Sequence, residues 1–207
     1  AHEDPDGTRS MVLDSVVDPA AEEYAEAPAN ARAAFDRFLD AVSADPAARA
    51  AFPRLGELME ETAASLDRTP GTARIRLPGG EAVSVRIDGS NMLDAVYSFL
   101  YDPESIPYLP LLVEAVSRGD VSHLAMFAEE LFYDDLSDGL YYALQGHDEA
   151  PFSAVSPPGG GTYDPLRLER EMALAFGSGR ADREANAPLS PDVSALVMAG
   201  GFDPITP

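Results

Sequence analysis

The sequence predicts a mainly α-helical domain that contains one β-hairpin and is flanked by two short strands near its ends. Most of the chain carries apolar residues at the i, i+3, i+4, i+7 spacing of amphipathic helices. Residues 72–87 instead alternate apolar and polar side chains around a Pro-Gly-Gly turn, which is typical of a hairpin. Continuous apolar runs at residues 11–13 and 195–199 are typical of parallel strands covered on both faces.

The first strand and the helices after it follow from local signals. The first apolar run ends in an Asp-Pro pair, so we assign residues 1–19 to this strand and its exit loop. Residues 29–42 then have the apolar spacing of an amphipathic helix. Asp45 is a suitable capping residue, and the proline after it is favoured at the first position of a helix. A second helix should therefore begin there. We expect this helix to run from Pro46 to about Leu66, with a break near Pro53 or Gly56.

The predicted hairpin consists of two alternating segments. In the first segment, apolar residues alternate with Thr72, Arg74 and Arg76. In the second segment, they alternate with Ser84 and Arg86. Because successive side chains of a strand point to opposite faces, the arginines should all lie outward. They carry a good part of the few positive charges in the chain.

Four further helices are expected after the hairpin, the first of them capped by Ser90. Between these helices, glycine, proline and aspartate residues interrupt the apolar periodicity. The helices are predicted at about residues 90–100, 108–118, 121–132 and 136–145, and a loop rich in Pro and Gly is predicted at 153–161. We therefore assign residues 20–187 to a central, mainly helical segment. Residues 188–207 form the third and last segment of the chain.

The last segment places an aspartate where functional side chains are often found. The apolar run 195–199 is followed by Gly-Gly-Phe-Asp-Pro, a pattern that indicates the exit of a strand into a loop. In open α/β sheets, functional side chains lie just beyond the carboxyl ends of the strands. Asp203 occupies this position.

Composition and charge exclude several classes of function. The chain has 14 Lys and Arg against 36 Asp and Glu, a net charge of −22, which repels nucleic-acid phosphates. No Cys is present, so the sequence offers no disulfide, thiolate nucleophile or Cys-ligated metal. No apolar run approaches the roughly 20 residues of a membrane span. A hydrophobic fraction of 45% is that of an ordinary globular protein.

Motifs for cofactors and metals are also missing from the sequence. The phosphate-loop and dinucleotide-binding fingerprints are absent, so no cofactor is predicted. His2, His123 and His147 have no metal-ligand spacing, so no metal is predicted either. The sequence has no Gly-x-Ser-x-Gly motif of the kind that carries a nucleophilic serine.

One polar cluster has two interpretations. His147, Asp148 and Glu149 follow a predicted helix and precede a proline. Gly146 could simply end the helix and leave solvated charges after it. Alternatively, Asp148 and Glu149 could face a pocket and hold a substrate ammonium by charge-assisted hydrogen bonds.

Four stretches together resemble α/β-hydrolases of the tripeptidyl aminopeptidase and proline iminopeptidase type. They are residues 9–19, 140–149, 185–188 and 196–207. The last contains Gly-Gly-Phe-Asp-Pro-Ile-Thr-Pro, which is similar to the acid turn Gly-x-x-Asp-Pro-x-Thr-Pro of that family. The helices between these stretches resemble the family's lid, and the resemblance covers nearly the whole chain.

The resemblance implies that Asp203 is the acid of a Ser-His-Asp triad. It implies that the helical lid, or cap, selects the free amino end of a peptide, and Asp148 and Glu149 are our candidates for contacts with that amine. The two end strands would be adjacent and parallel in the hydrolase sheet. The serine would precede Ala1 and the histidine would follow Pro207, so this chain alone should be inactive and its partners would be the remaining core segments.

The sequence departs from the family at two cysteine positions. One falls at Gly146, and a second falls near Gly177 and Ser178, so the resemblance implies one lost disulfide. It also implies a secreted or cell-envelope protein, and the absence of Cys weakens that inference.

Two alternative functions remain open at the level of sequence. An esterase or thioesterase could use the same fold on a small ester substrate, because fold does not fix the substrate. An apolar, tyrosine-lined lid pocket without an amine-binding carboxylate would favour it. A non-catalytic, acidic helical module that binds a basic peptide would also account for the charge, and its binding should weaken with salt.

Overall fold

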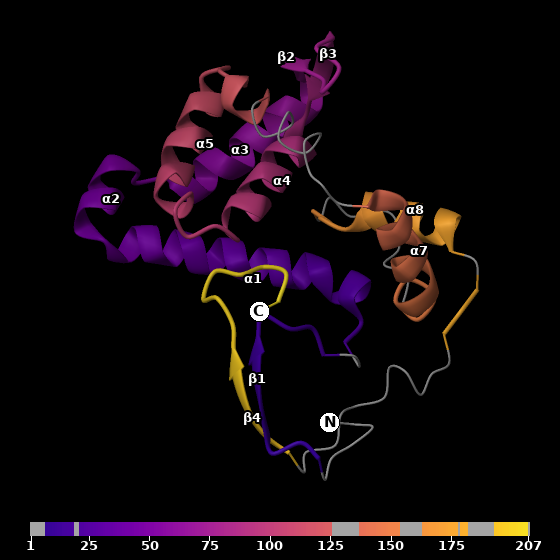
Figure 1. Ribbon diagram of the computed structural model, residues 1–207. Helices are drawn as coiled ribbons and strands as arrows, with labels where there is room; N and C mark the ends of the chain where they lie inside the picture. Colours follow the sequence, from indigo (N-terminus) through magenta and orange to yellow (C-terminus); the bar gives the residue numbers. More distant parts are fainter. Residues whose placement is uncertain are drawn as a thin grey trace. The chain divides into compact units, whose positions relative to one another are not determined.

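The computed structural model of the chain describes residues 7–18, 21–125, 137–153, 163–177, 179–181 and 193–206 (Figure 1). The described chain is mainly α-helical with two small sheets, which confirms the predicted fold class at that level. It divides into two compact units. The terminal unit comprises Ala1–Arg32 with Ser137–Pro207, and the helical unit comprises Ala33–Leu136. The first helix, α1 (Glu23–Ala44), contributes residues to both units.

Four further helices that lie wholly within the described residues belong to the helical unit. They are α2 (Pro46–Ala51), α3 (Leu55–Arg68), α4 (Gly89–Phe99) and α5 (Leu109–Ser117), with a 3-10 turn at Ile106–Tyr108. Helix α3 packs against both α4 and α5. Fully buried side chains of this unit include Phe38, Ile75, Met92, Val96, Val113 and Leu124. Burial of these apolar side chains is the main contribution to the stability of the unit.

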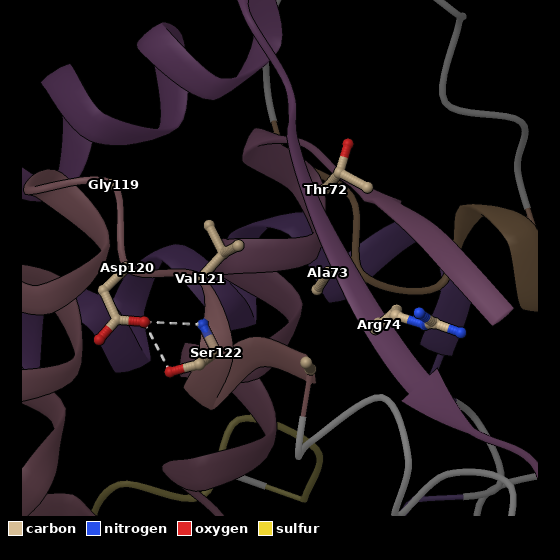
Figure 2. A pocket seen from close by; sticks show the side chains of 8 residues that line it. Thr72, Ala73, Arg74, Gly119, Asp120, Val121 and Ser122 are labelled. Atoms are coloured by element: carbon tan, nitrogen blue, oxygen red, sulfur yellow. Dashed lines mark hydrogen bonds between the residues drawn. The ribbon is translucent and has the colours of Figure 1, made fainter. Parts of the chain in front are cut away.

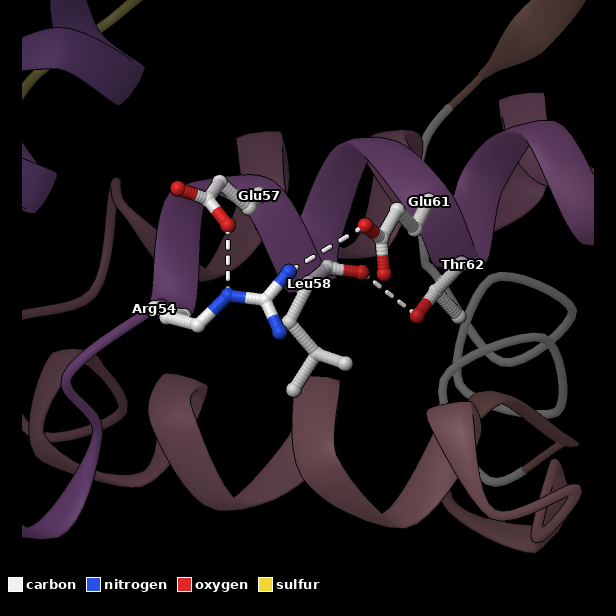
Figure 3. A network of polar contacts seen from close by, with 5 residues as sticks. All are labelled: Arg54, Glu57, Leu58, Glu61 and Thr62. Carbon is white, nitrogen blue, oxygen red and sulfur yellow. Dashed lines mark hydrogen bonds and ion pairs between the residues drawn. The ribbon is translucent and has the colours of Figure 1, made fainter.

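The predicted start of α2 and the predicted break after it are confirmed. The Asp45 carboxylate accepts hydrogen bonds from the backbone N–H groups of Ala47 and Ala48, at 2.9 and 2.8 Å. The helix ends before residues 52–54, where Pro53 lies between α2 and α3. At the start of α3, the Arg54 guanidinium contacts Glu57 at 2.5 Å (Figure 3). Such exposed ion pairs contribute at most about 1 kcal/mol to the free energy of unfolding. The packed face of α3 therefore contributes more to stability than this pair does.

The hairpin is confirmed as β2 (Gly71–Arg76) and β3 (Ala82–Ile87), paired antiparallel. Ala73 and Ile75 are buried, and the arginines of β2 point outward as expected. The alternation in the sequence therefore follows the two faces of this sheet.

The predicted cap at Ser90 is wrong, because Asp88 caps α4 instead. The Asp88 carboxylate accepts a hydrogen bond from the Asn91 backbone N–H, at 3.3 Å. The Asn91 side chain in turn accepts one from the Asp88 backbone N–H, at 3.0 Å. This reciprocal pair satisfies two backbone donors at the end of the helix, so the helix begins at Gly89.

The terminal unit contains the two end strands, β1 (Ser10–Asp14) and β4 (Ser194–Met198). They pair in parallel from Ser10 opposite Ser194 to Asp14 opposite Met198, which confirms that the two runs are adjacent and parallel. The prediction that both faces are covered is wrong for the described chain. Val12 is 68% exposed and Val197 is 64% exposed, because only two strands form this sheet among the described residues.

The terminal unit also contains α7 (Asp138–Asp148) and α8 (Arg167–Phe176), which pack side by side (Figure 1). The prediction that Gly146 could end the first of these helices is wrong, because α7 continues to Asp148 and Gly146 is buried in it. Helix α8 was not predicted from the sequence, although its apolar residues Leu168, Met172 and Phe176 recur at helical spacing.

Several sequence predictions fall outside the described residues. Of the helix expected at 121–132, only residues 121–125 are described, and 122–125 are helical. Most of the loop expected at 153–161 is outside. So are the predicted segment boundaries between residues 19 and 20 and between 187 and 188.

Candidate functional site

Asp203 lies in a tight turn directly after β4, at the position that the sequence predicts. It is 5% exposed. One carboxylate oxygen, Oδ1, accepts hydrogen bonds from the backbone N–H groups of Ile205 at 2.8 Å and Thr206 at 3.0 Å. The Thr206 hydroxyl donates to Oδ2 at 2.6 Å. These three hydrogen bonds fix the orientation of the carboxyl group.

A second group of polar side chains gathers in the terminal unit, and we call it the carboxylate–tyrosine cluster. Its members are Glu23, Tyr24, Tyr141, Glu149 and Glu169. The hydroxyls of Tyr24 and Tyr141 both donate to Oε1 of Glu169, at 3.1 and 2.8 Å. Because Tyr24 is buried against Ala150 and Ala173, α1 holds this contact in place beside α7 and α8.

The cluster concentrates negative charge in a half-buried place. Burial, followed by the charge of Glu169, raises the pKa of Glu23 above its ordinary value, and a hydrogen bond from Gln145 partly offsets this. Burial, followed by the charges of Glu23 and Asp148, raises the pKa of Glu149. Burial and Glu169 also raise the pKa of both tyrosines, so they remain protonated donors.

Within the described part of the chain, the ion pairs of Arg and His involve carboxylates other than those of Glu23, Glu149 and Glu169. A cation placed among the glutamates would relieve both their repulsion and their loss of hydration. An ammonium group offers three donors for such a site. The arrangement therefore suits a primary amine.

The structure separates the two carboxylates that the sequence proposes for amine binding. Glu149 lies in the cluster, near Glu23. The Asp148 carboxylate instead contacts Nδ1 of His147 at 2.6 Å. Sequence reasoning missed Glu23, Tyr24 and Glu169, because nothing in a local pattern relates residues 145 positions apart.

Gly146 of α7 and Gly177, which follows α8, lie against each other. A Cβ placed on Gly146 would lie 2.8 Å from the Cα of Gly177 and 2.0 Å from the backbone oxygen of Ala173. A Cβ placed on Gly177 would lie 2.6 Å from the backbone oxygen of Gly146. Because glycine has no Cβ, α7 and α8 can approach closely at these two positions.

The described residues contain neither a metal-binding cluster nor a membrane-spanning helix. No group of three or more His, Asp or Glu side chains there is arranged to hold a metal ion. None of the helices in this part of the chain is both long and apolar enough to cross a membrane. Comparison with protein-family models, with curated proteins and with solved structures finds no match.

The raised pKa of Glu149 leads to a prediction about stability. A carboxyl whose pKa is higher in the folded state favours folding when protonated, and this contribution is lost as pH rises through the folded pKa. Glu149→Gln should therefore raise the free energy of unfolding at pH 7, by less than about 1 kcal/mol because the group is partly hydrated. Below the ordinary pKa of 4.5, the gain should disappear.

Urea unfolding at pH 7 and at pH 4 measures this difference. Glu171→Gln is the matched control, because it removes an exposed carboxylate of α8 that pairs with Arg167 at 3.1 Å. The control should not gain stability at pH 7. A loss of stability in Glu149→Gln at pH 7 would contradict the electrostatic account of the cluster.

Proposed function

We propose that this chain forms the lid and the acid-bearing part of a serine hydrolase with the α/β-hydrolase fold, an exo-aminopeptidase that releases residues from the amino ends of peptides. The observation that carries the proposal is Asp203, a buried carboxylate held by backbone donors directly after a parallel strand. In a Ser-His-Asp triad, such a carboxylate orients the imidazole and stabilises its protonated form. The proposal assigns the serine and the histidine to segments outside this sequence.

The exposed parallel strands support the hydrolase part of the proposal. Parallel sheets in proteins are normally covered on both faces and extended by further strands. In β1 and β4, apolar side chains such as Val12, Leu196 and Val197 are more than half exposed, at 68%, 56% and 64%. Among the described residues, each of these strands pairs only with the other, so its second edge can offer backbone groups to a neighbouring strand. These features favour a place for both strands within a larger sheet.

The carboxylate–tyrosine cluster supports the aminopeptidase part. A free peptide amino end is an ammonium at neutral pH, with three donors and one positive charge. Glu23 and Glu149 would accept its hydrogen bonds, while Tyr24 and Tyr141 hold Glu169 in place. The site would then select peptides with a free amino end in the binding step, before the peptide bond is cleaved.

Substrates that differ only at the amino end test this selection. In a polypeptide that carries this sequence with the flanking core segments, free aminoacyl p-nitroanilides should be cleaved and their N-acetylated forms should not. Glu149→Gln should raise KM for the free amine about tenfold with little change in kcat, because one charge-assisted hydrogen bond is lost before the reaction.

Glu171→Gln serves as the control, since its carboxylate lies on the exposed face of α8. An unchanged KM in Glu149→Gln would mean that the cluster does not bind the substrate amine. Equal cleavage of N-acetylated esters would favour the esterase alternative, which needs no contact with an amine.

A further inference from the structure

A pocket of about 370 Å³ lies in the helical unit, along one edge of the hairpin (Figure 2). One wall is residues 72–74 of β2, and the other is the loop 119–122 with Ala125. Consecutive residues of a strand point to opposite faces, so a pocket lined by three of them lies at the strand edge. No residue of β3 lines it, so this is the β2 edge that faces away from β3.

The β2 edge can accept another strand. Within the described residues, β2 pairs only with β3, which leaves its second edge without a strand partner. Such an edge presents alternating N–H and C=O groups to which an extended peptide can add. One end of the pocket is closed, because a Cβ on Gly71 would lie 3.0 Å from Cγ1 of Val121. About three peptide residues would lie alongside residues 72–74, given a rise of roughly 3.3 Å each.

The outer face of the hairpin carries concentrated positive charge. The pairing of Thr72 with Arg86 and of Arg74 with Ser84 places Arg74, Arg76 and Arg86 on one exposed face. The whole chain has 14 Lys and Arg against 36 Asp and Glu, so three arginines on one short hairpin are a local exception. Arg86 pairs with Asp88 at 3.4 Å. Since salt screens charges beyond about 8 Å at physiological ionic strength, a ligand at this edge would respond mainly to Arg74, Arg76 and Asp120.

We propose that the β2 edge binds an extended, acidic peptide segment, which adds to the hairpin as a third strand beside Thr72–Arg74. Side chains of the peptide that share the outer face of the hairpin would be acidic and would lie near Arg74 and Arg76. Side chains on the other face would turn toward the loop that carries Asp120. The Asp120 carboxylate is fixed there by the backbone N–H and hydroxyl of Ser122, at 3.0 and 2.6 Å. It would repel acids, so the preferred peptide alternates acidic and neutral residues.

A dye-labelled hexapeptide of alternating Glu and Thr, blocked at both ends, tests the proposal by fluorescence anisotropy with the 207-residue chain. We expect saturable binding that Arg74→Glu weakens at least about tenfold, since charge pairs next to a strand are lost and replaced by repulsion. Arg49→Glu is the matched control, because it makes the same change in net charge at an exposed residue of α2. It should leave binding nearly unchanged.

A second peptide of the same sequence, with N-methyl groups on alternate amides, separates strand addition from simple attraction of charges. N-methylation removes backbone donors but no charge, so this peptide should bind at least about tenfold more weakly. Equal binding of both peptides, or displacement of the first by inorganic tripolyphosphate at equal charge concentration, would overturn the proposal in favour of a plain anion-binding surface. Absence of binding would overturn it as well. Because the peptides have no free amine, none of these results depends on the proposed aminopeptidase site.

Discussion

Replacing Asp203 with asparagine should lower the kcat of the proposed hydrolase about 10,000-fold, the size of effect seen when a triad acid loses its charge. Asparagine has nearly the same shape as aspartate. Its side-chain oxygen can still accept the hydrogen bonds that Ile205 and Thr206 donate to Oδ1 at 2.8 and 3.0 Å. The turn should therefore persist, while the negative charge that stabilises a protonated imidazole is removed. Turnover of a free aminoacyl p-nitroanilide, in a polypeptide that includes the core segments, measures the effect.

Asp45→Asn is a suitable control for this substitution. Asp45 caps α2 through its side-chain oxygen, and asparagine caps helices about as well as aspartate does. The control should keep full activity, and both variants should keep the circular dichroism spectrum of the original chain. If Asp203→Asn retained more than about a tenth of the activity, Asp203 would not be the triad acid, and the hydrolase proposal would lose its main support.

The features that the sequence predicted correctly depend on neighbouring residues. The cap at Asp45 requires only the backbone N–H groups two and three positions later. The hairpin requires alternation and a turn, and Asp203 follows its strand within a few residues. The prediction of Ser90 as the cap of α4 failed because the capping contact includes a return hydrogen bond from the Asp88 backbone N–H to the Asn91 side chain, at 3.0 Å.

The features that could not be predicted from the sequence depend on which helices pack against one another. Glu169 belongs to a highly charged helix, and such a residue is ordinarily hydrated. Its role in the cluster arises because Tyr24 and Tyr141, from two other helices, donate to the same oxygen. Helical periodicity identifies the faces of a helix but does not identify its partner, so these contacts require the folded structure.

Close packing of α7 and α8 connects the glycine contact to the cluster. On α7, Tyr141 and Gln145 are four residues apart and share a face, next to Gly146. On α8, Glu169 and Ala173 are likewise four residues apart. Contact of Gly146 with the backbone of Ala173 therefore draws the two helices together where Tyr141 donates to Glu169 at 2.8 Å. A side chain at this glycine should disturb both the packing and the cluster.

We accordingly expect Gly146→Ala to destabilise the terminal unit by about 1–3 kcal/mol, because its Cβ would lie 2.0 Å from the Ala173 backbone oxygen and the helices would have to move apart. Gly139→Ala is the matched control on the same helix, since a Cβ there meets no atom within 4 Å. It should instead add up to about 1 kcal/mol of helix propensity.

Hydrogen exchange of the α7 and α8 amides measures the difference. Ultraviolet titration should show the raised tyrosine pKa values falling toward the ordinary value of 10.0 only in Gly146→Ala. Equal protection of these amides in both variants would mean that the glycine contact does not hold the two helices together.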